Sequence, residues 1–301
     1  MKLGFVSSIL GHLGFDDVVA TAGKLGYGCV ELACWPAAGA ERRYAGVSHL
    51  DVDRLDAEHV RAVCERHSVE ISSLGFYPNI LSPDPGKREA AAEHLRKLIV
   101  AGKDLGVGMV TTFIGRDQTL DVEENFALFK AVWPPLIAFA EENGVRVAIE
   151  NCPMLFTRDE WPGGQNLASA PAVWRRMFEA IPSPYFGLNY DPSHFVWQMI
   201  DYIKPLYEFK DRIFHVHCKD VKLFRDKLAD VGVMAYPLEF MAPKLPGLGD
   251  VDWGAYASAL SDIGYDGHVC VEMEDRAFEQ NAETIESGLA LSKRYLSQFF
   301  A

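Results

Sequence analysis

Four side chains that can bind a metal ion each stand at the end of a short apolar run that reads as a strand. They are three carboxylates and one imidazole: Glu150, Asp191, His217 and Glu272. If these strand ends meet, three acids would repel one another and resist ionising together unless a cation lies among them. Three oxygen ligands and one nitrogen suit a divalent ion, and we favour Mn²⁺, with Mg²⁺, Co²⁺ and Zn²⁺ as alternatives.

Each of these residues has an ordinary structural explanation when it is taken alone. Glu150 could pair with an arginine, Asp191 could cap a helix, and His217 could be a histidine of the core. His215 lies two residues before His217, so both rings point to the same side of their strand. We expect His217, which is nearer the strand end, to be the ligand and His215 to be structural.

The stretch around Asp191 has the clearest local pattern. The apolar run 185–189 ends just before Asp191. Pro192 biases the backbone of Asp191 away from the helical region. The fixed φ of Pro192 also suits the first turn of a new helix. His194 is therefore expected on a loop or a first helical turn beside the carboxylate.

The elements that must position these residues read as eight strand–helix units. The predicted strands are residues 3–6, 29–32, 70–74, 109–113, 145–149, 185–189, 213–217 and 269–272. The helical patterns between and after them cover about 16–24, 53–66, 87–103, 122–142, 170–180, 195–209, 253–262 and 278–297. Strands that alternate with helices imply parallel strands with right-handed crossovers. Eight such units predict an α/β fold, a single (β/α)₈ TIM barrel that forms one domain over residues 1–301.

Several local signals refine this prediction. Helices stop at a glycine just before the next strand at Gly26, Gly106, Gly144 and Gly264, where a left-handed residue can end a helix. Pro134 and Pro135 should break or kink the helix at 122–142. The longest irregular stretches, 35–52, 153–169 and 221–251, all follow strands. We therefore expect long βα loops over the C-terminal mouth, where such barrels build their sites. A doubly wound sheet is the competing fold, but its glycine-rich phosphate motifs are absent from the sequence.

Composition excludes several classes of protein. The chain has 301 residues, of which 49% are hydrophobic and 24% charged, with a net charge of −13. A nucleic-acid partner would need a basic face, so none is expected. No apolar run approaches the ~18 residues of a membrane span, and the N-terminus does not read as a signal peptide. Six scattered cysteines read as reduced thiols of a cytoplasmic protein, which we expect to be a homo-oligomer, dimer or tetramer.

The motifs in order resemble a known superfamily. V-A-I-E-N-C at 147–152, N-Y-D-P-S-H at 189–194 and H-V-H-C-K-D at 215–220 resemble the xylose isomerase-like TIM barrels, and G-D-V-D-W at 249–253 and Y-D-G-H-V-C-V-E at 265–272 fit as well. The chain is most similar to the sugar phosphate isomerase/epimerase group. That group includes ketose 3-epimerases and enzymes of inositol breakdown, with endonuclease IV as a distant relative.

The resemblance implies roles for particular residues. It implies a metal held by the four ligands named above, with Glu150 and Glu272 also transferring protons on opposite faces of the substrate. His194 matches a histidine that touches the substrate in epimerases. Ketose 3-epimerases carry an arginine six residues after the metal-binding histidine. That position is Leu223 here, so Lys219 or Arg225 would have to replace it.

The implied reaction is proton abstraction beside a carbonyl. A cation that binds a hydroxyketone makes the adjacent C–H more acidic, and one glutamate removes that proton to give a metal-bound enediolate. Return of a proton to the same carbon gives epimerisation, and return to the neighbouring carbon gives isomerisation. Loss of a β substituent would instead make the protein a lyase or dehydratase on a keto-sugar, keto-inositol or 3-keto-glycoside.

Side chains that follow the earlier strands are candidates for substrate binding. Aromatic rings there could stack on a sugar, and an arginine could meet a phosphate or carboxylate, although loop packing explains each equally well. With His194 and Lys219, these candidates are Trp35, Tyr77, Asn79, Phe113 and Arg116, and Glu31 is a further supporting position. No phosphate loop is evident, which favours an unphosphorylated sugar.

Two other classes of protein are rivals. An AP endonuclease with three zinc ions needs histidine ligands where this chain has 76–78 and 113–115, and an Asp-x-His pair where it has 220–222. The other rival is a non-catalytic sugar-binding barrel or a subunit of a larger enzyme. The complete set of ligands argues against a loss of catalysis, but not against the need for a second subunit.

Overall fold

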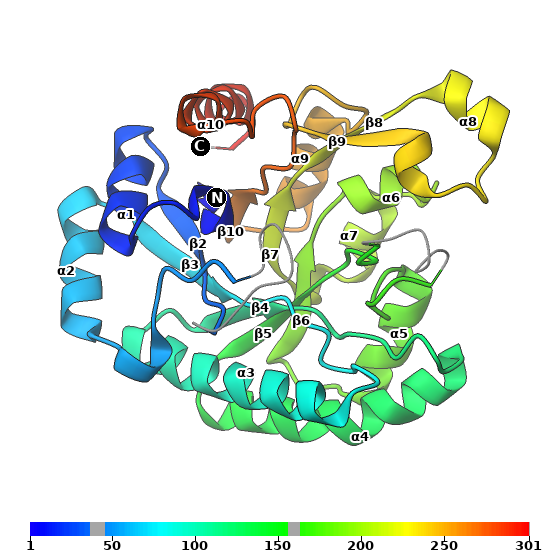
Figure 1. Cartoon of the computed structure of the whole chain (residues 1–301), viewed down its shortest axis with the longest axis horizontal. Helices are drawn as coiled ribbons and strands as arrows, with labels where there is room; N and C mark the ends of the chain where they lie inside the picture. Colours follow the sequence, from blue (N-terminus) through cyan, green and yellow to red (C-terminus); the bar gives the residue numbers. More distant parts are fainter. Residues whose placement is uncertain (37–45, 156–162, 301) are drawn as a thin grey trace.

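The computed structural model describes residues 1–36, 46–155 and 163–300, and its central feature is a closed barrel of parallel strands (Figure 1). Around the barrel the strands run in the order β1, β10, β7, β6, β5, β4, β3 and β2. Their bounds are β1 Lys2–Val6, β2 Cys29–Ala33, β3 Glu70–Gly75, β4 Met109–Thr112, β5 Arg146–Glu150, β6 Phe186–Tyr190, β7 Ile213–Cys218 and β10 His268–Val271. The predicted (β/α)₈ barrel is therefore confirmed.

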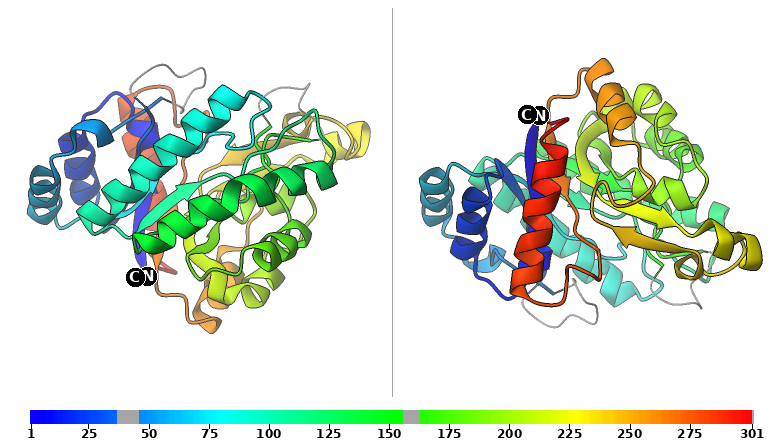
Figure 2. Two further views of the ribbon diagram at one scale, coloured as in Figure 1. Left: turned by 90° about the horizontal axis from the view of Figure 1, so that it is seen from below. Right: turned by 90° about the horizontal axis from the view of Figure 1, so that it is seen from above.

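Helices cover the outside of the barrel and complete the core. The longer ones are α1 Phe15–Lys24, α2 Ala57–His67, α3 Pro85–Leu105, α4 Val122–Glu142, α5 Pro171–Ala180, α9 Trp253–Asp262 and α10 Ala282–Leu296. Short 3₁₀ turns are η1 Ser7–Leu10, η2 Val52–Arg54, η4 Lys210–Arg212 and η5 Pro237–Glu239. Figures 1 and 2 show α3 and α4 side by side against one flank of the barrel. Among the described residues, none of the helices is long and apolar enough to span a membrane.

Local capping chemistry explains where these helices begin and end. The Asp84 carboxylate accepts from the amides of Gly86 and Lys87 at the start of α3, and Asp121 and Glu124 form a reciprocal capping box on α4. The four glycines predicted to end helices all have positive φ, which confirms the repeated strand–helix boundary.

Two of the helices differ from their predictions: a break was one of the two outcomes expected at Pro134 and Pro135, and one helix was expected at 195–209. The helix α4 continues through Pro134 and Pro135 instead of breaking, because its long apolar face is buried against the barrel and offsets the ~3 kcal/mol that an internal proline costs. The helix predicted at 195–209 is two short helices, α6 Ser193–Trp197 and α7 Lys204–Glu208. Met199, with φ of 57°, interrupts the helical backbone between them.

The stretch 221–251, predicted to be irregular, contains an ordered excursion from the barrel. Strands β8 Asp220–Leu223 and β9 Met241–Lys244 pair antiparallel, and α8 Arg225–Val231 lies between them at the edge of the molecule (Figure 2). The buried Asp220 carboxylate accepts from the amides of Gly247 and Val251 and from the Trp253 indole, which ties the excursion to the barrel. The other two long stretches are 35–52 and 153–169. Within them, residues 37–45 and 156–162 lie outside the described part of the chain.

The strand register brings the sequence-predicted ligands to one rim. Glu150, the last residue of β5, pairs with Asn189 of β6, so Asp191 comes two residues further along at the same end. His217 of β7 pairs with Cys270 of β10, and Glu272 follows β10 directly. Since all of these strands are parallel, their carboxyl ends share one mouth of the barrel.

Candidate metal centre and active site

Glu150, Asp191, His217 and Glu272 meet at the mouth of the barrel. One ligand atom from each lies within 4.8 Å of the others, although the residues span more than a hundred positions of sequence. The Nδ1 atom of His217 is 3.5 Å from Glu272 Oε2 and 4.0 Å from Glu150 Oε1. Glu150, Asp191 and His217 are buried, while the Glu272 side chain is 21% exposed and opens the cluster toward solvent.

Several polar atoms of this cluster have no hydrogen-bond partner among residues 1–36, 46–155 and 163–300. Glu150 Oε1, Asp191 Oδ2 and His217 Nδ1 are buried and unpaired, and so is Nε2 of the neighbouring His194. Buried polar atoms in proteins are nearly always hydrogen-bonded, so a group of adjacent unpaired lone pairs needs an explanation. Two carboxylate oxygens and an imidazole nitrogen that converge without partners fit the ligand shell of a divalent cation.

Asparagine side chains hold two of the carboxylates in place. Asn151 bonds the backbone of Asp191 in both directions, at 2.8 and 2.9 Å, and Asn166 donates to the Glu150 carbonyl at 2.9 Å. The other carboxylate oxygen of Asp191, Oδ1, accepts from the Ser193 amide. The Asn166 and Asn151 contacts fix the backbone of the two acids, and the Ser193 contact occupies Asp191 Oδ1, which leaves Asp191 Oδ2 for the centre of the cluster.

Lys219 also reaches into the cluster. Its Nζ lies 2.6 Å from Glu272 Oε2 and 3.3 Å from both Asp191 Oδ2 and Glu274 Oε2. The lysine therefore neutralises part of the negative charge, but Glu150 Oε1 and His217 Nδ1 remain without a hydrogen bond. One cation from the chain does not satisfy the whole cluster.

The crowding of acids and bases shifts the pKa of each group in the metal-free protein. Burial and the nearby Glu272 carboxylate raise the pKa of Glu150 to about 8. Burial opposes ionisation of Glu272 as well, but Lys219 and His217 outweigh it and hold the pKa of Glu272 well below its usual value. Burial would lower the pKa of His217, yet Glu31 and Glu272 raise it well above 6.5. A cation that binds here must displace these protons.

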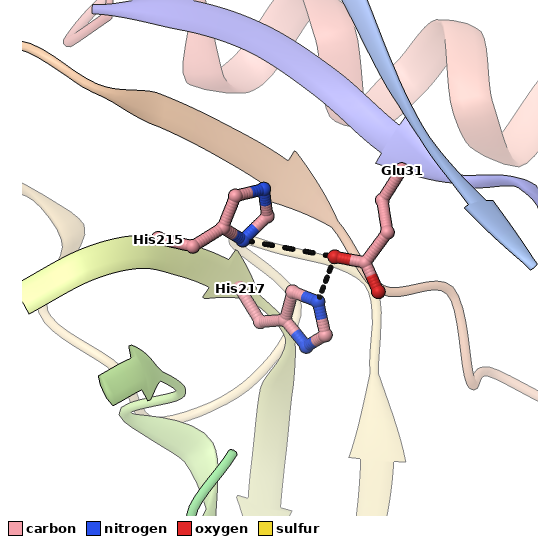
Figure 3. A group of neighbouring side chains, drawn as sticks. All are labelled: Glu31, His215 and His217. Atoms are coloured by element: carbon pink, nitrogen blue, oxygen red, sulfur yellow. Dashed lines mark hydrogen bonds and ion pairs between the residues drawn. The ribbon is translucent and has the colours of Figure 1, made fainter. Parts of the chain in front are cut away.

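Glu31 sets the orientation of the His217 ring. Figure 3 shows Glu31 reaching from β2 toward the two histidines of β7. Since a carboxylate can only accept, His217 Nε2–H donates to Glu31 Oε2 at 2.9 Å, which turns Nδ1 toward the acids, where a cation would replace its proton. A carboxylate behind a metal-binding histidine fixes its tautomer in this way in many metal sites. Glu31 was predicted only as a supporting position after strand two; it lies within β2 and points into the barrel.

Glu31, His215 and His217 also bring ligand atoms close together, but both nitrogens of His215 already have hydrogen-bond partners. His215 Nδ1 donates to Asn189 Oδ1 at 2.9 Å, and His215 Nε2 accepts from the Ser72 hydroxyl at 3.0 Å. Each nitrogen of His215 thus has a hydrogen-bond partner, and Nδ1 also lies 3.7 Å from Glu31 Oε2 (Figure 3). The structural role of His215 stays a prediction.

Tyr77 and Phe113, both predicted to bind substrate, lie beside the cluster. The Tyr77 hydroxyl donates to Glu31 and accepts from Asn189, and its ring centre is 6.2 Å from that of His217. Phe113 packs on Tyr77 with ring centres 4.9 Å apart. His194 is closer still, with Nε2 3.2 Å from Glu150 Oε1 and 3.4 Å from Asp191 Oδ2. The first turn of α6 holds His194, as predicted.

The remaining candidates contact neighbouring loops. Asn79 bonds the backbone of Arg116 in both directions at 2.8 Å, and Arg116 Nη1 donates to the Gly163 carbonyl at 2.6 Å. Trp35 packs against Phe76 with ring centres 4.9 Å apart. A substrate contact for these three residues stays a prediction.

Glu274 is a site residue that the sequence reading missed. Its Oε2 is 3.3 Å from Lys219 Nζ, and burial followed by the opposing effect of Lys219 leaves its pKa raised to about 7. The signal was present, because Glu274 stands two residues after Glu272 and extended backbone turns such residues to the same side.

A family model described as a xylose isomerase-like TIM barrel matches residues 19–295. The uncharacterized protein YfiH of Bacillus subtilis is 28% identical over 337 aligned positions, which cover 99% of this chain and all of that protein. An inosose dehydratase of Clostridium tetani is 33% identical over 101 residues, 33% of this chain and 34% of its own.

Solved structures show the same fold. A crystal structure of the IOLI protein with a bound zinc atom has a TM-score of 0.73 at 19% identity and covers 100% of both chains. A D-psicose 3-epimerase with D-tagatose from Clostridium cellulolyticum has a TM-score of 0.73 at 15% identity over 99% of each chain. At these identities the likeness establishes the barrel and not the activity.

Proposed function

We propose, since this chain belongs to the xylose isomerase-like TIM-barrel family, that it is a divalent-metal-dependent sugar isomerase or epimerase that removes a proton next to a carbonyl. The observation that carries the proposal is the convergence of buried ligand atoms on Glu150, Asp191 and His217 that have no hydrogen bond within the described residues, with Glu272 completing the set. Lys219, 3.3 Å from Asp191 Oδ2, offsets only part of the charge. A structural cluster would be expected to satisfy these atoms internally.

The four ligands would hold the ion, and we favour Mn²⁺ because three oxygens and one nitrogen suit a harder cation, with Zn²⁺ as the main alternative. When bound, such an ion polarises a substrate carbonyl and stabilises the negative charge that develops on its oxygen. The chain itself must move the proton and exclude water.

Glu150 and Glu272 are the proton-transfer groups in this proposal. Glu150 is the last residue of β5 and Glu272 follows β10, and β6 and β7 separate these strands in the barrel. The two carboxylates therefore approach a substrate at the centre from different sides, so one can remove a proton and the other can return one.

Lys219 takes the place of the arginine that ketose 3-epimerases have. Leu223 is buried in β8, where its side chain belongs to a small apolar cluster with Trp197, Val221 and Phe240, so that position offers no charge to the site. Lys219 is itself buried at the cluster, and burial, which alone would lower its pKa, is outweighed by Glu272 and Glu274, which keep it charged. We assign Lys219 to the oxygen that becomes negative, with His194 beside it as a contact for a substrate hydroxyl.

Elimination is the second candidate reaction. The same anion loses a β substituent if one can leave, and the inosose dehydratases matched over about a third of this chain favour a lyase on a keto-inositol or keto-sugar. Lys219 and Glu274 lie beside the site, and either could donate the proton that a departing hydroxyl needs.

The deciding experiment follows the substrate proton by NMR in D₂O. A panel of ketoses, inososes and 3-oxo-glycosides is incubated with the protein and Mn²⁺, and deuterium is expected at a carbon next to the carbonyl. Chelation of the metal should stop exchange by at least about 100-fold, and added Mn²⁺ should restore it. A protein that holds one ion per chain yet exchanges no proton across the panel would favour the non-catalytic alternative.

A further inference from the structure

We propose that an apolar chamber next to the ligand cluster receives a planar apolar substituent of the substrate, so that the substrate is an aryl-substituted sugar ketone and not a free sugar. This inference rests on the proposed function. The chamber is a cavity of about 220 Å³ between the loop after β5, the helix α6 and the β8–β9 excursion. Its walls include Met154, Leu155, Trp197, Tyr236, Met241 and Pro243.

The chamber adjoins the ligand cluster through shared side chains. His194, Lys219 and Glu274 line the cavity, and the first two also contact the ligands: His194 Nε2 is 3.2 Å from Glu150 Oε1, and Lys219 Nζ is 2.6 Å from Glu272 Oε2. A molecule whose carbonyl lies at the cluster therefore has its next groups at the mouth of the chamber.

The chamber is polar at this end and mostly apolar elsewhere. Two further polar side chains line it, Ser193 and Asp220, and the Asp220 carboxylate is already bonded to Gly247, Val251 and Trp253. The other walls are proline, methionine and other mainly apolar side chains. A sugar hydroxyl placed among them would lose its water without gaining a partner, which is unfavourable. An apolar group would gain from the same burial.

The size and the lining favour an aromatic ring. An engineered cavity of about 150 Å³ in another protein binds benzene, so about 220 Å³ has room for one ring. Methionine sulfur makes favourable contacts with ring edges, and Met154 and Met241 both line the cavity.

The walls are built into the fold. Trp197 and Val221 are buried and pack with Leu223 and Phe240 in a small core of their own beneath the excursion. Met154 is fully buried and holds a left-handed backbone with φ of 58°. Such a conformation is costly for a residue other than glycine and persists only where its surroundings enforce it. The loop after β5 is thus held in a shape that presents Met154 to the cavity.

The test compares methyl and phenyl glycosides of the same 3-oxo-hexose. With Mn²⁺ in D₂O, kcat/KM for proton exchange is expected to be at least about tenfold higher for the phenyl compound, the lower bound for one apolar group in a fitting pocket. Calorimetry measures the affinity of both compounds as well, so the chamber is tested even if neither exchanges. Equal affinities, or a preference for the methyl compound, would overturn the inference.

Two substitutions by aspartate test whether the preference for the phenyl compound arises in the chamber. Leu238 lines the cavity and is 45% exposed, whereas Val233 lies in the same excursion outside the lining and is 59% exposed. Leu238→Asp should reduce the phenyl-to-methyl affinity ratio toward one, and Val233→Asp should leave that ratio unchanged. A ratio that survives Leu238→Asp would contradict the chamber. If both compounds exchange at equal rates, the proposed function would still hold, but the chamber would have no role in choosing the substrate.

Discussion

Replacing Glu150 with glutamine is expected to lower proton exchange by at least about 10³-fold while the barrel stays folded. General acid–base catalysis is worth about 10² to 10⁴ in rate, and glutamine removes the exchanging proton as well as a charged ligand. Exchange is measured in D₂O at saturating Mn²⁺, and bound metal is measured by elemental analysis, which separates a lost ligand from a lost base.

The matched control is Glu70→Gln. Glu70 is also a strand residue, but it begins β3 at the opposite end of the barrel and pairs with Lys2 at the surface. This variant should keep normal exchange, which would show that a strand glutamate is not required merely for the fold. Near-normal exchange in the Glu150 variant would remove Glu150 from the mechanism.

The Glu150→Gln variant should also be more stable than the parent protein when metal is absent. The Glu150 carboxyl has a usual pKa of 4.5, which burial and Glu272 raise to about 8 in the folded chain. The contribution of this carboxyl to the free energy of unfolding is therefore fully present below pH 4.5. It is lost progressively as the pH rises from 4.5 through the folded-state pKa of about 8. At pH 7 the loss is about 3 kcal/mol, since each pH unit above the usual value costs about 1.4 kcal/mol.

Glutamine does not ionise, so the variant should escape this loss. Urea unfolding with a chelator is expected to show a difference of about 3 kcal/mol at pH 7 that vanishes near pH 4. A variant less stable than the parent protein at pH 7 would show that the acids are not crowded as described. Such a result would fit a buried ion pair better than a metal site.

The barrel and the meeting of the four ligands could be predicted because both follow from pattern alone. Strand ends lie within two residues of their predicted positions, and parallel strands that close a ring must place their carboxyl ends on one rim. Residue type at those ends then suffices to suggest a metal. Neither step needs the conformation of a side chain.

Other features depend on contacts that pattern does not encode. The β8–β9 pair includes Pro243 and short apolar runs, so the sequence shows no clean alternation there, and Asp220 anchors it through bonds to distant amides. Lys219 was a candidate for substrate binding, but its direction toward Glu272 and Asp191 depends on the turn between β7 and β8. The mid-strand Glu31 has no flanking signal, and its meaning emerges only when β2 is seen to face His217 across the barrel.

Replacing Glu31 with alanine is expected to weaken Mn²⁺ binding by about 10- to 100-fold, the usual effect of removing a partner behind a metal-binding histidine. Without the carboxylate, nothing selects the tautomer of His217 that leaves Nδ1 free, and the Tyr77 hydroxyl also loses its acceptor. Glutamine keeps an acceptor oxygen but no charge, so Glu31→Gln should fall between the parent protein and Glu31→Ala. Calorimetric titration with Mn²⁺ measures each affinity.

The visible spectrum of the Co²⁺-loaded protein adds a readout that a general loss of stability would not move, because band positions report the ligand geometry around the ion. Glu31→Ala should shift these bands, and Glu31→Gln should restore them in part. The control is Ser72→Ala, which removes a partner of His215 one step further from the site and should change Mn²⁺ affinity less than threefold. If Glu31→Ala binds Mn²⁺ as tightly as the parent protein, the barrel wall alone orients His217, and Glu31 serves Tyr77 instead.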